Sequence, residues 1–229
     1  MDWVWGHLDL IGSQTLAHIG LSVPPIVIGF VISIPFGYWA SRSAVARGVL
    51  LTAGNILYTI PGLALVVFVP VFLGFSLFNP LNLVVALSLY AFAIMVRSAA
   101  DAFASVSEDV KQSASAQGYS TGQRFFRVEL PLAGPVLLAG ARVVSVSTIS
   151  LVTIGALVGI PSLGTFFTDG FQRDFLLEAF VGFVLVLVLA AAFDVLIGLL
   201  GRLLMPWNRG PSLHGPRSRV APRPVRQGV

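Results

Sequence analysis

Side chains that could carry out catalysis are sparse in this sequence. Its 229 residues include no cysteine, which excludes disulfides, thiolate metal ligands and cysteine nucleophiles. No G-x-x-x-x-G-K-[ST] phosphate loop and no H-E-x-x-H zinc motif occurs, so the chain has no sequence signature for hydrolysing nucleotides or for metallohydrolase chemistry. We therefore predict a protein that is not an enzyme and that needs no cofactor or metal.

Polar residues gather instead in one stretch, residues 105–131. Two serines there have the spacing of a capping box: Ser105 with Glu108, and Ser120 with Gln123. Gly118 stands where a helix C-cap is expected, because glycine adopts left-handed backbone angles without a steric penalty. Pro131 is expected to stop the helix before it. The stretch therefore predicts two short helices joined by a glycine corner.

The elements around this stretch are too apolar for a soluble domain. Hydrophobic residues make up 56% of the chain and charged residues 10%, against about 25% charged residues in soluble domains. Apolar runs of about 20 residues suffice to cross a bilayer. The runs are residues 20–40, 49–73, 81–96, 143–160 and 177–200. We predict an all-α polytopic membrane protein with about five transmembrane helices.

Three regions follow from this pattern. Residues 1–19 are expected to form an interfacial segment, because aromatic and histidine side chains lie near their start and no basic region of a cleavable signal peptide occurs. Residues 20–205 form the transmembrane domain, with the polar loop at 105–131. Residues 206–229 are rich in proline, glycine and arginine and contain no acidic residue, so we expect a disordered basic tail.

Basic residues predict how the chain is oriented. In the five-span topology almost all of them fall on one side, and short loops rich in Lys and Arg stay cytoplasmic. Of the loop residues, only Arg173 falls on the other side. The polar loop and the C-terminus are therefore expected in the cytoplasm, and the N-terminus outside it. This topology also explains the net charge of +4, so we predict contact with a lipid bilayer and no nucleic-acid partner.

Polar side chains inside the predicted spans have two interpretations. They either allow helices to pack closely or line a polar pathway. The candidates for a pathway are Asn55, Thr59, Pro61, Ser145 and Thr148. Arg142 is expected to mark the cytoplasmic boundary of the fourth span. Asp194 lies inside the fifth, where an ionisable residue is costly and a candidate for function; we favour a structural part for it.

The polar loop resembles the EAA loop of binding-protein-dependent ABC importer permeases. The resemblance rests on the segment Gln112-Ser113-Ala114, on Gly118 six residues after its start, and on Leu130-Pro131. Gln112 replaces the usual acidic residue, and Ser113 replaces the first alanine. The resemblance implies a type I ABC importer permease fold, in which these residues dock onto an ATP-binding subunit.

A second resemblance narrows the group. The segment Thr59-Ile60-Pro61-Gly62-Leu63-Ala64-Leu65 is similar to Thr-Ile-Pro-Ser-Leu-Ala-Leu of osmoprotectant importer permeases. The glycines of residues 159–170 resemble the Gly-x-Gly-Gly-Leu-Gly loop of the same group. These similarities imply a subunit of a bacterial inner-membrane importer for glycine betaine, choline or proline. They also imply three partners: an ATP-binding subunit, a second permease subunit that is identical or related, and an extracytoplasmic binding protein.

Two alternatives remain open at this point. A permease for methionine or another amino acid would share the coupling loop and a similar glycine loop. An ATP-independent secondary transporter would instead predict internal repeats and functional charges at the membrane midplane, and the sequence shows no convincing repeat.

Overall fold

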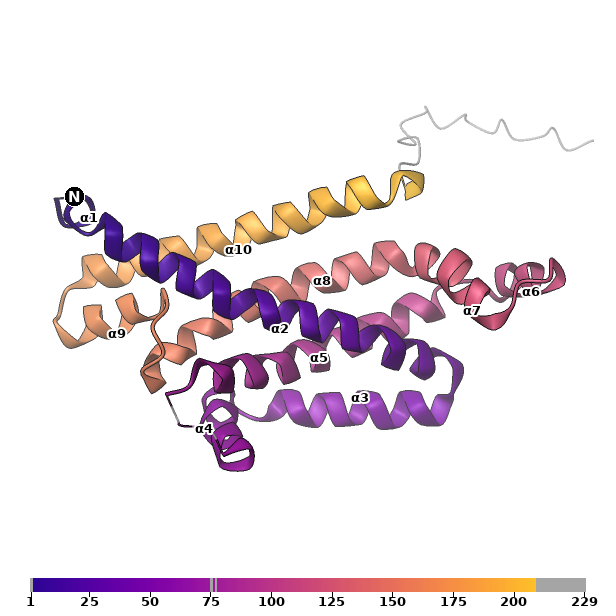
Figure 1. Ribbon diagram of the computed structural model, residues 1–229, viewed down its shortest axis with the longest axis horizontal. Coiled ribbons are helices and arrows are strands. Elements are labelled where there is room, and N and C mark those ends of the chain that lie inside the picture. Colours follow the sequence, from indigo (N-terminus) through magenta and orange to yellow (C-terminus); the bar gives the residue numbers. More distant parts are fainter. Residues whose placement is uncertain (1, 75, 77, 209–229) are drawn as a thin grey trace, which may run out of the picture.

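The computed structural model describes residues 2–74, 76 and 78–208, and every regular element in this part of the chain is a helix. The helices form an elongated bundle (Figure 1). This confirms the predicted all-α fold. The α-helices are α1 (Asp2–Gly6), α2 (Leu8–Arg42), α3 (Ala44–Thr59), α4 (Gly62–Leu73), α5 (Pro80–Ala104), α6 (Glu108–Ala116), α7 (Thr121–Arg124), α8 (Leu130–Val152), α9 (Thr165–Gln172) and α10 (Leu176–Leu204). A π-helix (η1, Phe125–Glu129) joins α7 to α8, and two 3-10 helices follow α8 and α10 (η2, Thr153–Val158; η3, Pro206–Asn208).

Helix α5 is the centre of the bundle, with α2, α3, α4 and α8 packed against it. The α2–α5 contact is close because glycines face alanines. A Cβ on Gly37 would lie 2.7 Å from the carbonyl carbon of Ala99, and one on Gly29 would lie 2.9 Å from that of Ala91. Small residues at such positions let transmembrane helices approach each other.

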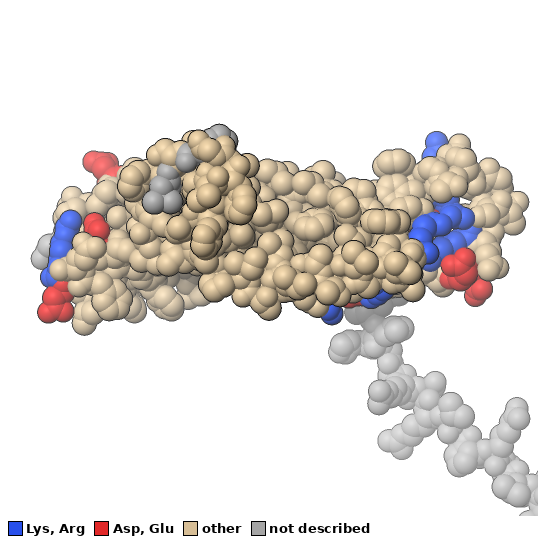
Figure 2. Space-filling view, turned by 90° about the horizontal axis from the view of Figure 1, so that it is seen from below, with Lys and Arg blue, Asp and Glu red and all other residues tan. Residues whose placement is uncertain are grey.

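Helix lengths and composition agree with a membrane protein. Four helical segments are long and apolar enough to cross a bilayer, and α3 with α4 form a bent pair that would be a fifth span. Figure 2 shows charged side chains gathered toward the two ends of the molecule, with a broad band between them that carries few charges. The turn from α2 to α3 lies at the same end as α6 and α7, whereas α1 and α9 lie at the opposite end (Figure 1).

Helix boundaries differ from the predicted spans at two places. Helix α2 begins at Leu8, so the boundary expected after residue 19 lies inside a continuous helix. The second predicted span is broken: α3 and α4 meet at a bend of 103°. Pro61 disfavours a helical conformation at the residue before it, and Ile60 is accordingly extended. The Tyr90 hydroxyl of α5 donates to the Ile60 carbonyl and holds the break in place.

Two local predictions in the polar stretch are wrong. Ser105 does not cap the following helix, because α5 continues to Ala104 and the Ser105 hydroxyl donates to the Ala102 carbonyl. Glu108 pairs with Lys111 instead. Pro131 does not end a helix, since it lies in the first turn of α8, where a missing N–H is tolerated. Of the predicted tail, residues 209–229 lie outside the described residues.

Candidate functional site

Helix α6 ends in the glycine corner that the sequence predicts. Gly118 has φ +86°, in the left-handed region that favours glycine. Its N–H donates to the Ser115 carbonyl at 3.0 Å, and the N–H of Tyr119 donates to the Ala114 carbonyl at 3.2 Å. These two bonds form a Schellman motif, which satisfies carbonyls left open at a helix end.

The next helix, α7, starts with the predicted capping box. The Ser120 hydroxyl accepts from the Gln123 N–H at 3.3 Å, and the Gln123 side chain accepts from the Ser120 N–H at 3.0 Å. Residues 118–122 also match the letters G-x-S-x-G of a hydrolase nucleophile turn. That turn joins a strand to a helix, whereas Ser120 joins two short helices. Ser120 is therefore a helix cap.

The predicted docking residues fall into two sets. Gln112 and Ser113 are exposed on α6, on the surface that a partner could reach. Ala114 is buried, while Leu130 and Pro131 are half-buried at the start of α8. The structure thus separates an exposed contact face from residues that hold the loop against the bundle. Their role in docking stays a prediction.

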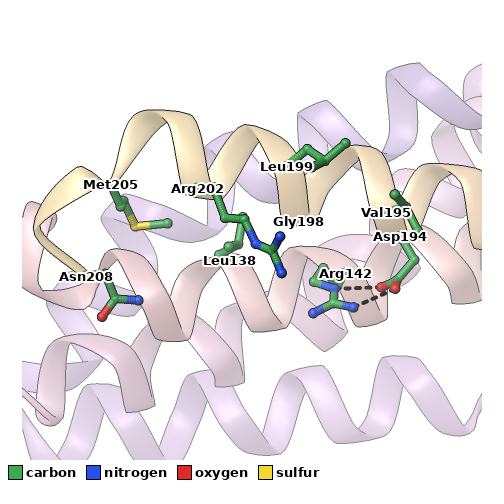
Figure 3. A pocket seen from close by; sticks show the side chains of 10 residues that line it. Leu138, Arg142, Asp194, Val195, Gly198, Leu199, Arg202, Met205 and Asn208 are labelled. Carbon is green, nitrogen blue, oxygen red and sulfur yellow. Dashed lines mark hydrogen bonds and ion pairs between the residues drawn. The ribbon is translucent and has the colours of Figure 1, made fainter. Parts of the chain in front are cut away.

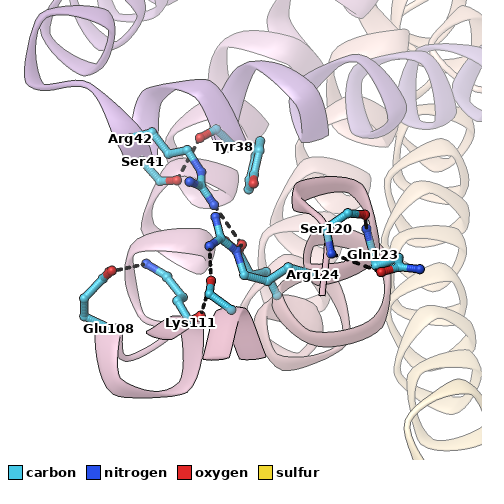
Figure 4. Close-up of polar contacts among 10 residues, drawn as sticks. Tyr38, Ser41, Arg42, Glu108, Lys111, Ser120, Gln123 and Arg124 are labelled. Carbon is cyan, nitrogen blue, oxygen red and sulfur yellow. Dashed lines mark hydrogen bonds and ion pairs between the residues drawn. The ribbon is translucent and has the colours of Figure 1, made fainter. Parts of the chain in front are cut away.

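Glu129 anchors this loop to the bundle. Its side chain is 1% exposed, and its Oε1 accepts from Arg42 Nη2 at 2.8 Å and from Arg124 Nε at 2.9 Å. Arg124 also donates from Nη1 to the Ser115 hydroxyl of α6 at 2.8 Å. Figure 4 shows Arg42 and Arg124 converging from α2 and α7. One buried carboxylate thereby ties α2, α6, α7 and the start of α8 together.

Aromatic contacts reinforce the same junction. The Tyr38 ring of α2 lies 4.6 Å from Phe125 of η1 and 5.3 Å from Phe103 of α5, between ring centroids. The Arg42 guanidinium lies 4.5 Å above the Tyr38 ring, within the range of a cation–π interaction. The loop is thus seated on α2 and α5 by both apolar and charged contacts.

Reasoning from sequence alone missed the part played by Glu129 and Arg42. A signal existed, because Glu129 is the only acidic residue between Asp109 and Asp169. An isolated carboxylate beside arginines and an apolar helix is a candidate for a buried ion pair. Its partner Arg42 lies 87 positions away in the sequence, so the pairing itself could not be read from local spacing.

The predicted pathway residues do not share one environment. Asn55, Thr59 and Pro61 are exposed at the end of α3 and at the bend before α4. Ser145 and Thr148 of α8 are buried, where they pack between helices. A pathway role for these five residues stays a prediction, and the structure gives the α3 residues the accessible positions.

Arg142 lies in the middle of α8 rather than at a helix boundary, and it is joined to Asp194 of α10. Arg142 Nε donates to Asp194 Oδ1 at 2.7 Å, and Nη2 donates to Oδ2 at 2.5 Å. This bidentate geometry is the strong form of an Arg–carboxylate contact. The pair therefore ties α8 to α10, which agrees with the structural part expected for Asp194.

Comparison with known proteins identifies the kind of chain that carries this loop. Residues 29–210 match the family described as "Binding-protein-dependent transport system inner membrane component". The chain is 27% identical over 196 residues to the choline transport system permease protein OpuBB of Bacillus subtilis, covering 84% of this chain and 88% of the relative. It is 28% identical over 204 residues to the carnitine transport permease protein OpuCB of Listeria monocytogenes, covering 88% and 90%. It is also 28% identical over 212 residues to the osmoprotectant import permease protein OsmW of Salmonella typhimurium, covering 90% and 98%.

Solved structures show the same fold. A chain of the inward-facing MetNI methionine ABC transporter superposes with a TM-score of 0.71 at 22% identity, covering 88% of this chain and 97% of that one. A chain of an amino acid ABC transporter crystallised with histidines gives 0.66 at 14% identity, covering 89% and 96%. At these identities the likeness concerns the fold alone, and it confirms the importer-permease architecture.

Proposed function

The chain belongs to the family of binding-protein-dependent transport system inner membrane components, and from this premise we propose that it is the permease subunit of an ATP-driven importer for small osmoprotectants. The relatives that it matches over most of their length are named as permeases for choline, carnitine and osmoprotectants. The single observation that carries the mechanism is the corner at Gly118, seated on the bundle by Glu129.

The geometry of the loop suits the transfer of a mechanical displacement. Helix α6 presents Gln112 and Ser113 outward, where a partner's groove can receive them. Behind this face, the Schellman corner and the Glu129 ion pairs connect α6 to α2 and α8. When an ATP-binding subunit moves α6, the attached helices move with it as a unit, because no flexible linker separates α6 from them.

Three partners and one location follow from this assignment. We propose a separate ATP-binding subunit at α6, a second permease subunit that completes the pathway, and an extracytoplasmic binding protein at the end that carries α9. The chain lies in the bacterial inner membrane, with α6 and the end of α10 on the cytoplasmic side and the N-terminus on the other. The basic residues around the α2–α3 turn and in α6–η1 support this orientation.

Uptake measurements test the proposal. The chain is co-expressed with its ATP-binding subunit, reconstituted in proteoliposomes, and supplied with binding protein and radiolabelled glycine betaine, carnitine or choline. We expect uptake that needs both ATP and the binding protein. Uptake that persists without ATP would establish the secondary-transporter alternative, and ATP-dependent uptake of methionine but of none of the three osmoprotectants would establish the amino acid permease.

A further inference from the structure

An apolar groove of ≈ 620 Å³ lies between α2, α8 and α10, and every residue that lines it is apolar. The groove is open to the surroundings of the bundle, since Val27 on its α2 wall and Leu204 on its α10 wall are 52% and 71% exposed. Arg142 and Asp194 also join α8 to α10 (Figure 3), but neither of them lines this groove. The groove therefore offers contacts to an apolar chain and none to a charged group.

The length of the groove matches the hydrocarbon layer of one membrane leaflet. Along α8 its lining runs from Leu130 to Ala141, a rise of about 17 Å at about 1.5 Å per residue. Half of a hydrocarbon core of about 30 Å is about 15 Å. One end of the groove lies at the start of α8, at the end of the bundle that carries α6 and α7 (Figure 1). The groove thus spans about the depth of the leaflet on that side.

A basic and an interfacial side chain lie at this same end. Arg127 is exposed and precedes Leu130 by three residues where η1 continues into α8, so the two share about one face. Within the described part of the chain, the Arg127 side chain has no hydrogen-bond or ion-pair partner. Trp207 lines the groove and is 55% exposed, which is typical of tryptophan at a membrane–water interface.

The sequence adds a second basic feature directly after Trp207. Residues 209–229 contain five arginines and no acidic residue. A cluster of about four to eight basic residues next to the cytoplasmic end of a transmembrane helix is typical of segments that bind anionic lipids. The apolar groove and the basic residues at its end therefore indicate one class of ligand, with an apolar chain and an anionic headgroup.

We propose that the groove holds one acyl chain of an anionic phospholipid, with the phosphate beside Arg127 at the membrane surface. An apolar helix of another subunit would cover the same walls but would bring no acceptor to Arg127, whereas phosphate oxygens accept well from a guanidinium. The acyl chain packs between α2 and α10. Helix α10 needs such support, because it has the smallest buried share of the four continuous spans that the structure describes. The inference concerns the bilayer and does not depend on the transported substrate.

Brominated lipids test the proposal, because bromine on an acyl chain quenches the fluorescence of a tryptophan that it approaches. The full chain, assembled with its partner subunits, is reconstituted in phosphatidylcholine vesicles with increasing fractions of brominated phosphatidylglycerol or brominated phosphatidylcholine. The signal of Trp207 is the difference between this chain and Trp207→Phe, so that all other tryptophans cancel. Trp39→Phe gives the matched control, since Trp39 of α2 is 56% exposed and does not line the groove.

Trp207 should be quenched at about fivefold lower fractions of phosphatidylglycerol than of phosphatidylcholine, because one basic residue near anionic headgroups contributes about that factor. Its quenching should saturate, as expected for one site, whereas Trp39 should respond in proportion to the brominated fraction and equally to both lipids. Arg127→Gln should lower the preference at Trp207 by about twofold or more. Arg47→Gln is the control at the same end of the bundle, since Arg47 lies on α3 and pairs with Asp101, and it should leave the preference unchanged.

Three results would overturn the inference. Equal responses of Trp207 to the two lipids, or an unaltered preference in Arg127→Gln, would show that no anionic headgroup is held beside Arg127. Quenching of Trp207 that rises in proportion to the brominated fraction, as at Trp39, would show ordinary boundary lipid. A Trp207 signal that neither lipid quenches would show that another subunit or the rest of the chain covers the groove.

Discussion

Replacing Glu129 by glutamine should loosen the coupling loop while leaving its partner-facing surface unchanged. Glu129→Gln keeps the size of the side chain but removes the charge that Arg42 and Arg124 share at 2.8 and 2.9 Å. Both arginines donate to the same oxygen, Oε1, so the oxygen of a glutamine can still accept from them, but as a neutral acceptor. The junction of α2, α7 and α8 loses the negative charge at its centre.

The size of the effect follows from burial. Hydrogen bonds to charged groups contribute about 1.5–3 kcal/mol each, and Glu129 is 1% exposed. Arg42 is 38% exposed and Arg124 17%, so solvent screens the Arg42 bond and only the Arg124 bond keeps its full value. Since neutral bonds contribute about 0.5–1.5 kcal/mol each and can remain, we expect a loss of about 2 kcal/mol in unfolding free energy, which corresponds to a melting temperature lower by roughly 4–8 °C for a chain of this size.

Two assays check this prediction. Thermal unfolding of the purified protein in detergent measures its stability. The ratio of ATP hydrolysed to substrate imported in proteoliposomes measures the coupling of hydrolysis to transport. We expect the melting temperature to fall and the ATP cost per imported substrate to rise, because a loosened loop can move without the spans. Asp101→Asn is the control, since the exposed Arg47–Asp101 pair at the same end should contribute at most about 1 kcal/mol. Equal effects of the two substitutions on coupling would refute the anchoring role of Glu129.

Three further predictions concern backbone and caps. Gly37→Val should destabilise the α2–α5 contact by about 1–3 kcal/mol through overpacking, whereas Gly20→Val, where a Cβ meets nothing within 4 Å, should not; equal melting temperatures would count against the close approach. Gly118→Ala should lower the unfolding free energy by about 1–2 kcal/mol, because alanine is strained at these left-handed backbone angles. Gly122→Ala, in the helical α7, should be neutral or stabilising. Thermal unfolding and co-purification of the ATP-binding subunit compare the two variants. Ser120→Ala should cost about 1 kcal/mol by removing the cap and should speed amide hydrogen exchange in α7; unchanged exchange would show that the cap is dispensable.

The sequence predicted those features that depend on contacts between residues close together in the chain. Gly118 and Ser120 were placed correctly because a Schellman corner and a capping box involve residues within five positions of each other. Ser105 was misplaced because the end of α5 is set by burial: Ala102 and Phe103 are fully buried, and they extend α5 to Ala104, so that Ser105 lies at the C-terminal end of α5 and does not start the next helix. The break before α4 follows from Pro61 itself, but the contact that holds it comes from Tyr90 of another helix.

The features that the sequence did not predict depend on contacts between segments far apart in the chain. One partner of Glu129, Arg42, comes from the end of α2, and the partner of Arg142 comes from α10. The expected position of Arg142 at a membrane boundary stays a prediction. That an aspartate from a neighbouring span pairs with it is revealed only by the packed bundle.

Helix α8 connects the Glu129 junction to the Arg142–Asp194 ion pair. It begins directly after Glu129, within the junction that carries α6, and it contains Arg142 at its middle. A continuous helix of 23 residues is about 35 Å long and transmits displacement as a rigid rod. A shift imposed on the anchored loop must therefore also move Arg142 relative to α10. Since Asp194 holds Arg142 from α10, the ion pair bears the relative motion of the two helices. The contact between α8 and α10 is therefore expected to change whenever the ATP-binding subunit changes state, which links nucleotide binding to the packing of the last span.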